Sequence, residues 1–474
     1  MTGHGPRRAV VFVLALAAGA CAVLAVGAGA EPSRDPTAAA LATPVWSPRR
    51  VPQPLVDGVG AQRLQGRLDA EVGGVDACIV VTTGDGDTVL ATRNADAPLL
   101  PASSQKLFTA VAALTVLGQE HRFETTAVAP AAPSDGAVEQ LWLVGSGDPV
   151  LATPEFAAEL ATEPFYEGTD VVLTPMADLA DAIVAAGVRR IPGGIHGDDT
   201  RYEMVRYLPT WRDTYRTDGQ IGPLGALTVN DGFSALNPEP VPVEDPALFA
   251  ALELTRLLVA RGVEIGGSPG HSEAPSDAAV VGSVQSRPLG DIVGGLLRSS
   301  DNLTGELLTR EIGVRASNDG TTTAGTQAIV ATLEQLGVPT EGLTLIDGSG
   351  LDRGDQATCT QLIATLDLGE LPGLQILWDS LAVAGETGTL RDRFAGSPLR
   401  GRLRAKTGAL MGVTALTGLL DVGRPLRFAF LASGGFTEGE GIALRERVAA
   451  IIAEFPSAPP GDALVPPPAP PTSG

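Results

Sequence analysis

The chain has 474 residues and a formal net charge of −22, which argues against a nucleic-acid partner and gives no reason to expect a phosphate-binding role. At this length we expect more than one domain, with cores of Ala, Val, Leu and Ile because aromatic residues make up only 4%. The four histidines follow no metal-ligand spacing, so we expect no metal, no other cofactor and no Ser-His-Asp triad.

The first 30 residues have the pattern of an export signal. Arg7 and Arg8 supply a positive start, an apolar run spans residues 9–29, and Ala28-Gly29-Ala30 has the small residues of a cleavage site. The run is also long enough to cross a bilayer, so an uncleaved N-terminal membrane anchor is the alternative to a cleaved signal peptide. In both cases we expect an extracytoplasmic protein, located in a periplasm-like space, in the cell wall or in the medium.

Two segments rich in proline flank the folded body. Residues 31–53 are interpreted as a linker. Residues 457–474 are interpreted as a disordered or wall-spanning tail. The body itself therefore begins near residue 54.

Residues 54–123 are expected to form the first part of a domain that resumes further along the chain. Apolar spacing predicts a helix over residues 61–72 and a hairpin over residues 77–82 and 87–93. A second helix is expected over residues 103–117, with Ser103 and Lys106 in its first turn.

After residue 123 the pattern changes to short strands and turns, which we interpret as an inserted mixed α/β region over residues 124–282. A strand is expected at residues 140–144, a helix at 179–187 and a turn-rich strand passage at 190–198. Asp245 as N-cap and Pro246 at the first helical position predict a helix over residues 247–260.

Residues 283–456 are expected to complete the first domain. Helices are predicted at residues 289–297, 303–312 and 323–336, with Asn302 at the start of the second. Two apolar runs, residues 413–422 and 426–432, predict an antiparallel meander after Lys406.

Lys106 and Lys406 are the only two lysines, against thirty-one arginines. Arginine can replace lysine for solubility, but its guanidinium does not deprotonate at usable pH, whereas an amine can be adjusted to act as a base. Each lysine lies in a short motif that could carry chemistry. Residues three apart on a helix share a face, so the amine of Lys106 can reach the hydroxyl of Ser103.

Three motifs occur in a fixed order: Ser103-X-X-Lys106, Ser300-Asp301-Asn302 and Lys406-Thr407-Gly408. Each alone is a weak signal, and each has a plain structural interpretation as a helix cap, a polar turn or a strand-edge charge. Together they form the constellation of the penicillin-binding proteins and serine β-lactamases. Ser103 and Ser300 lie 197 positions apart, which leaves room for an inserted region that a compact β-lactamase lacks.

From about residue 54 to residue 455 the chain resembles the D-alanyl-D-alanine carboxypeptidase/endopeptidase family, the class C low-molecular-mass penicillin-binding proteins. Further matching stretches are residues 99–103, 145–149, 347–351, 388–390 and 393–394. The resemblance implies an α/β (α+β) fold, in which an antiparallel sheet flanked by helices forms a β-lactamase-like transpeptidase domain that carries the large insert. It also implies peptidoglycan stem peptides and β-lactam antibiotics as partners, with membrane contact only through an uncleaved N-terminal segment.

The family mechanism assigns roles by position. Ser103 would attack the carbonyl between two D-alanines, with Lys106 as base and Ser300 as proton relay to the leaving amine. Burial and the nearby charge of Lys406 would both keep the amine of Lys106 neutral by lowering its pKa. The backbone N–H groups of Ser103 and Ala409 would form the oxyanion hole, as the resemblance implies.

Other positions would bind the substrate. Asn302 would hydrogen-bond the peptide amide before the scissile bond, Lys406 and Thr407 would hold the terminal carboxylate, and Gly408 would let the strand approach closely. Asp148 and Arg353 lie in matching stretches and could bind the amine and carboxylate of a diaminopimelate side chain. Their plain interpretations are a turn cap and a surface charge.

Two alternative functions stay open. A β-lactamase-like hydrolase would use the same motifs but would need a device for fast deacylation, and none can be identified in the sequence. An idle wall-associated scaffold is a second possibility, but a dead site would let Lys106 and Lys406 drift to arginine. Neither the choice between carboxypeptidase and endopeptidase nor the oligomeric state follows from the sequence.

Cys78 and Cys359 are left once Cys21 is removed with the export segment. Their spacing does not decide whether they pair, and we expect two separate buried thiols.

Overall fold

The structure is a computed structural model that describes residues 53–166 and 170–456. The predicted export segment, nearly all of the linker and the Pro-rich tail lie outside these residues. None of the described helices combines the length and the hydropathy that a membrane span requires.

The larger sheet has six strands in the order β14-β15-β16-β17-β1-β2, and every neighbouring pair is antiparallel. Alternate residues of a strand face opposite sides of a sheet. In β1, Cys78 and Val80 belong to one core, whereas Ile79 and Val81 belong to the other. The sheet is therefore buried on both faces. Its strands are β1 (Asp76–Thr83), β2 (Val89–Arg93), β14 (Ala382–Val383), β15 (Leu403–Leu410), β16 (Val413–Asp421) and β17 (Pro425–Ser433).

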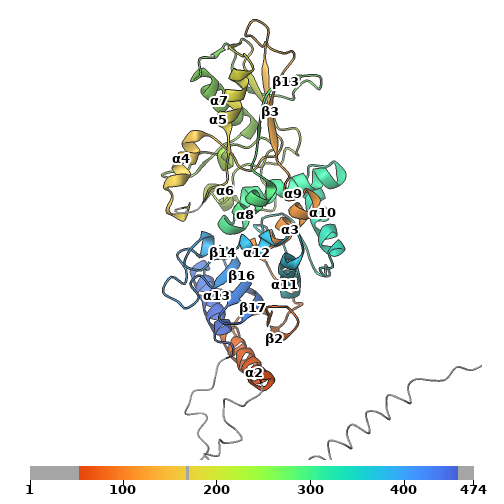
Figure 1. Cartoon of the computed structure of the whole chain (residues 1–474), viewed down its shortest axis with the longest axis vertical. Helices are drawn as coiled ribbons and strands as arrows, with labels where there is room; N and C mark the ends of the chain where they lie inside the picture. Colours follow the sequence, from red (N-terminus) through yellow and green to blue (C-terminus); the bar gives the residue numbers. More distant parts are fainter. Residues whose placement is uncertain (1–52, 167–169, 457–474) are drawn as a thin grey trace, which may run out of the picture. The chain divides into compact units, whose positions relative to one another are not determined.

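Helices cover the two faces of this sheet (Figure 1). The first core contains buried residues of α3 (Lys106–Val116), α8 (Leu289–Ser299), α9 (Asn302–Ser317), α10 (Thr322–Gln335), α11 (Cys359–Asp367) and α12 (Ile376–Asp379). The second core contains residues of α2 (Gln53–Glu71) and α13 (Glu438–Ala453). The predicted α/β fold with an antiparallel sheet flanked by helices is confirmed, as are the 77–93 hairpin, the meander and the start of α9 at Asn302.

A disulfide bond joins β1 to α11. Cys78 and Cys359, with Cα atoms 5.8 Å apart, are bonded through their Sγ atoms. The expectation of two separate thiols was wrong, because the two residues lie 281 apart in the chain and only the packing of α11 on the sheet brings them together.

The smaller main sheet has five strands in the order β12-β8-β4-β3-β13. Helices α5 (Met176–Ala185) and α7 (Pro246–Val259) share its core (Figure 1). Asp245 caps α7 by accepting hydrogen bonds from the N–H groups of Ala247 and Leu248, as predicted. Its strands are β3 (Glu124–Ala129), β4 (Leu141–Val144), β8 (Ile195–Asp198), β12 (Gly270–His271) and β13 (Ala279–Gln285). The limits of the inserted region at residues 124 and 282 stay a prediction.

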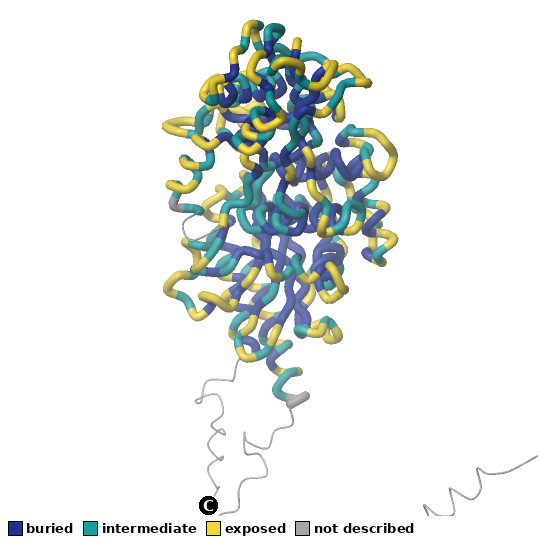
Figure 2. Tube along the Cα trace, turned by 45° about the horizontal axis from the view of Figure 1, so that its top comes forward, coloured by how far each residue is buried: buried dark blue, intermediate teal, exposed yellow. Residues whose placement is uncertain are grey.

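Short elements complete the region that contains this second sheet. They are β5 (Leu151–Ala152), α4 (Pro154–Thr162), β6 (Thr174–Pro175), β7 (Arg190–Ile191), α6 (Asp213–Thr217), β9 (Phe233–Ala235), β10 (Val241–Pro242) and β11 (Glu264–Ile265). Buried residues run through the interior of both sheet layers, and exposed residues lie mainly on outer loops (Figure 2).

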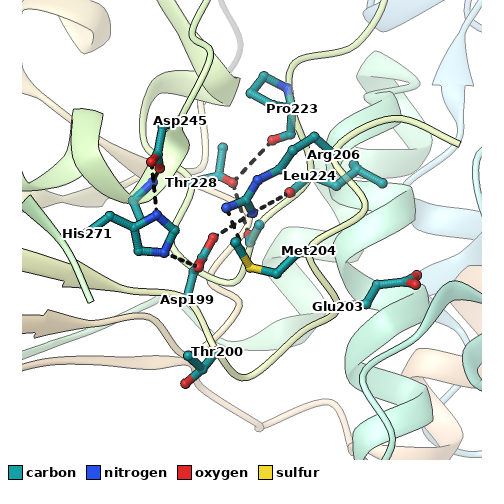
Figure 3. Close-up of polar contacts among 12 residues, drawn as sticks. Asp199, Thr200, Glu203, Met204, Arg206, Pro223, Leu224, Thr228, Asp245 and His271 are labelled. Carbon is teal, nitrogen blue, oxygen red and sulfur yellow. Dashed lines mark hydrogen bonds and ion pairs between the residues drawn. The ribbon is translucent and has the colours of Figure 1, made fainter. Parts of the chain in front are cut away.

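A chain of charged groups ties β8, α7 and β12 together (Figure 3). His271 contacts Asp245 through Nδ1 at 2.9 Å and Asp199 through Nε2 at 3.0 Å. The second oxygen of Asp199 pairs with Arg206 at 2.5 Å, and Arg206 also donates to the carbonyl of Leu224. This network fixes Asp199, where the passage from the second sheet toward α9, residues 199–220, begins.

Candidate active site

Ser103 lies in a single turn of 3-10 helix, η2 (Ala102–Gln105), directly before α3. The predicted helix 103–117 is therefore two elements, because the turn that carries Ser103 is wound more tightly than the rest. Ala102 has φ +44°, a left-handed conformation that costs a residue with a side chain free energy. Lys106 Nζ donates a hydrogen bond to Ser103 Oγ at 3.0 Å, the contact that the Ser-X-X-Lys spacing predicts.

The amine of Lys106 has two further acceptors. These are Asn302 Oδ1 and the carbonyl oxygen of Ser349, each at 2.7 Å. An ammonium group has three donors, so its hydrogen-bonding capacity is fully used. Lys106 is fully buried. The site thus joins the first two motifs through one amine.

Burial lowers the pKa of Lys106 to about 8, while Asp347, Asp301, Glu306 and Asp355 oppose this by raising it. The expected help from the charge of Lys406 is not among these causes. The pKa of Lys406 is also lowered well below its usual value, first by burial and then by the charges of Lys106 and Arg445. Lys406 therefore gives up its proton more easily than an exposed lysine.

The third motif meets the second through Lys406. Helix α8 ends at Ser299, Ser300 is its C-cap with φ +65°, and α9 begins at Asn302. Lys406 Nζ donates to Ser300 Oγ at 2.7 Å and to the carbonyl of Thr407 at 2.8 Å. Thr407 Oγ1 donates to the hydroxyl of Thr389 at 2.9 Å.

Strand β15 lies against the turn that carries Ser103. A Cβ atom at Gly408 would lie 2.9 Å from the carbonyl oxygen of Pro101 and 3.1 Å from Cβ of Ala102. Arg445 from α13 donates to the carbonyl of Gly408 at 3.0 Å. Glycine at this position therefore allows the close approach, and Ala409 follows it on the same strand.

Asn302 is held from both ends of its amide. Its oxygen accepts from Lys106, and its Nδ2 donates to the backbone carbonyl of Gln220 at 2.7 Å. Gln220 follows α6, so the region of the second sheet reaches into the site. A cavity of about 470 Å³ adjoins this point, and its lining includes Ser299, Asp301 and Gly388.

Asp148 and Arg353 make contacts of their own. Asp148 is 2% exposed, and its Oδ1 accepts the N–H of Val150 at 3.0 Å, which is the contact of a turn cap. Burial raises its pKa to about 6. Arg353 donates to the carbonyl of Met411 at 3.1 Å, in the turn after β15. Neither of these two hydrogen bonds reaches a residue of the three motifs.

The sequence did not predict the carbonyl group that accepts a hydrogen bond from the Lys106 amine, nor the buried carboxyl groups that hold the turn with this carbonyl. The carbonyl of Ser349 and the buried carboxyl groups of Glu306 and Asp347 carry no motif of their own. The stretch 347–351 could be noted only as part of a resemblance. Nothing in the sequence of α9 marks Glu306 as different from a solvated charge on a helix.

Comparisons with known proteins identify the family of this chain. Residues 61–240 and 234–455 match the model of the D-Ala-D-Ala carboxypeptidase 3 (S13) family. A D-alanyl-D-alanine carboxypeptidase from an Actinomadura strain is 29% identical over 85% of this chain and 87% of its own length. A carboxypeptidase from Mycobacterium tuberculosis is 31% identical over 86% of each chain. The crystal structure of penicillin binding protein 4 from Haemophilus influenzae matches with a TM-score of 0.68 and 21% identity, covering 81% of this chain and 98% of that one. This chain belongs to the D-Ala-D-Ala carboxypeptidase 3 (S13) family.

Proposed function

We propose that this protein is a serine-type D-Ala-D-Ala carboxypeptidase that acts on peptidoglycan stem peptides through an acyl-serine intermediate. The observation that carries the proposal is the fully buried amine of Lys106, with its pKa lowered to about 8, at 3.0 Å from Ser103 Oγ. A base at that distance and with that pKa suits proton removal near neutral pH. The curated relatives named as carboxypeptidases support the same activity.

Acylation follows from these contacts. The neutral amine of Lys106 takes the proton of Ser103, and Oγ forms a bond to the carbonyl carbon between the two D-alanines. The C–N bond then breaks, and the proton that Lys106 took passes through Ser300, whose hydroxyl is hydrogen-bonded to Lys406, to the leaving amine, so that Lys106 is neutral again. The N–H groups of Ser103 and Ala409 stabilise the charge on the carbonyl oxygen. Water later hydrolyses the ester and regenerates Ser103.

Substrate binding uses the third motif and Asn302. Lys406 and Thr407 hold the terminal carboxylate, with Thr407 kept in place by Thr389. Asn302 has one N–H that is not needed by Gln220, and this donor binds the amide that precedes the scissile bond. The adjoining cavity of about 470 Å³ offers space for a larger leaving group, so the same chemistry would also cut cross-links as an endopeptidase.

For the side chain of the stem peptide we retain Arg353 and not Asp148. Arg353 lies beside Met411, directly after the strand that carries Ala409. Asp148 is buried, and one of its oxygens caps a turn. The enzyme acts outside the cytoplasm, where its peptidoglycan substrate lies, and residues 1–30 serve as signal peptide or anchor.

Intact mass before and after benzylpenicillin tests this function, on the chain without residues 1–30. We expect a stable adduct on Ser103 in the parent, as a structural neighbour of this fold has been solved with a β-lactam. Ser103→Ala and Lys106→Arg should form none, because the first lacks the nucleophile and the second lacks a base. Consumption of the drug without an adduct would favour a β-lactamase-like hydrolase. Intact drug without an adduct would favour the idle scaffold.

A further inference from the structure

Residues 347–350 form a turn beside the amine of Lys106, and a buried carboxyl group holds this turn in place. The carbonyl of Ser349 in this turn accepts the hydrogen bond from Lys106 at 2.7 Å. The N–H groups of Gly348 and Ser349 both donate to Glu306 Oε1, at 3.0 and 2.7 Å. Glu306 lies on α9 and is 0% exposed.

The second oxygen of Glu306 has no hydrogen-bond partner among the described residues, although it is buried. Burying a carboxyl group with an unused acceptor costs free energy, so such a group calls for an explanation beyond folding. Asp347 differs, because both of its oxygens are used. They accept from Gly350, Asp352, Gln105 and Trp211. Asp347 therefore builds the turn, and Glu306 fixes it against α9.

We propose that Glu306 is a positioning residue for acylation, which holds the carbonyl of Ser349 against the amine of Lys106 through the N–H groups of Gly348 and Ser349. The inference rests on the proposed function, in which this amine takes the proton of Ser103. A turn that moves by an ångström would let the amine rotate away from Ser103. A misplacement of that size can cost about 10²-fold in rate.

The charge of Glu306 acts on the same amine. Burial and then the charge of Asp347 raise the pKa of Glu306, Ser349 through its side chain and its N–H and then the charge of Arg310 lower it, and the resulting pKa is about 8. Besides Glu306, the carboxyl groups that raise the pKa of Lys106 against its burial are Asp347, Asp301 and Asp355. Without the Glu306 carboxylate, Lys106 should therefore lose its proton at lower pH.

Three variants separate the effect of the length of the Glu306 side chain from the effect of its charge. Glu306→Gln keeps the reach and an acceptor oxygen without the charge, Glu306→Asp keeps the charge and loses the reach, and Glu306→Ala loses both. Because the chain has only two lysines, ¹³Cε-lysine labelling gives one NMR signal for each, and Lys106→Arg assigns them. In Glu306→Gln we expect the Lys106 titration to move to lower pH, with acylation by benzylpenicillin retained. In Glu306→Asp and Glu306→Ala we expect acylation to be about 10²-fold slower at every pH.

Asp367→Asn is the control, since Asp367 also carries a part-buried carboxyl group but accepts a hydrogen bond from Arg427 and has no role in the turn or in the contacts of α9. It should leave the Lys106 titration and the acylation rate unchanged. Wild-type acylation rates in the Asp and Ala variants, or an unmoved Lys106 titration in Glu306→Gln, would overturn the inference. Unfolding of all three variants would overturn it too, since the carboxyl group would then serve the fold. A parent chain without an adduct on Ser103 would instead overturn the proposed function. The lysine titrations would still test whether Glu306 acts on Lys106.

Discussion

At the scale of single residues, the two lysines have opposite tasks. Both are fully buried and both have a lowered pKa. Lys106 faces several carboxyl groups that raise its pKa, whereas Lys406 faces the cations Lys106 and Arg445. A base benefits from the lowered pKa, but a group that binds a carboxylate must regain its proton.

Binding of a carboxylate should therefore raise the pKa of Lys406. In the free protein burial, Lys106 and Arg445 favour the neutral amine, and an anion beside it favours the ammonium form, so a proton is taken up on binding. In ¹³Cε-lysine Ser103→Ala, benzylpenicillin should move the Lys406 titration to higher pH. The methyl ester of the drug, which lacks the carboxylate, is the control and should move it less. An equal shift with both compounds would show that the carboxylate binds elsewhere.

The sequence predicted these residues because the motifs place chemistry at fixed short spacings. Ser103 and Lys106 share a helix face, and their contact could be expected from that alone. The acceptors of Lys106 from Asn302 and Ser349 come from segments about 200 residues away or more, so only the folded chain brings them to the amine. The tight turn at Ser103 was missed because a 3-10 turn and an α-helix share the same apolar pattern.

At the scale of elements, the close approach of β15 to the turn η2 brings the third motif to Ser103. A side chain at position 408 would meet Pro101 and Ala102. We expect Gly408→Val to slow acylation by benzylpenicillin about 10²-fold, because the strand must move away from Ser103. Gly396→Val is the control, since a Cβ atom there meets nothing within 4 Å. Similar acylation rates in the two variants would contradict the close approach.

The bond between Cys78 and Cys359 should stabilise the packing of α11 on the larger sheet. It closes a long loop, with a sequence separation of 281, and so restricts the unfolded chain. We expect the double variant Cys78→Ala/Cys359→Ala to lose about 2–5 kcal/mol of unfolding free energy in urea. Wild-type protein whose disulfide bond has been reduced should unfold at a urea concentration similar to that of the double variant. An unchanged midpoint in both samples would show that helix packing alone holds this face.

At the scale of the whole molecule, the second sheet and the active site are joined through α9. Tyr202 and Arg201 donate hydrogen bonds to Glu311. Arg310 donates hydrogen bonds to the carbonyl oxygens of Glu203 and Val205. The passage that makes these contacts begins at Asp199 and ends near Gln220, which bonds Asn302. The helices of this region could be predicted from apolar periodicity, but their docking could not, because it depends on polar contacts between distant segments.

Asp199 is the point at which this connection should be most sensitive. Its side chain is 0% exposed and lies between His271 and Arg206, whose side chain is 16% exposed (Figure 3). Removing one partner of a buried ion pair leaves a buried charge uncompensated, so we expect Asp199→Ala to cost about 3–5 kcal/mol of unfolding free energy in urea. Acylation should fall as well, because the passage that begins at Asp199 holds α9 and, through Gln220, Asn302.

Asp181→Ala is the matched control in the same region. Asp181 pairs with Arg261 at the surface, where its own side chain is 65% exposed, and an exposed pair contributes about 0–1 kcal/mol. It should therefore change neither the urea midpoint nor the acylation rate appreciably. If Asp199→Ala behaves like Asp181→Ala in both measurements, the second sheet does not support the active site through this network. If Asp199→Ala loses stability but acylates normally, the network serves the second sheet alone, and Asn302 is held in place by Lys106 without help from Gln220.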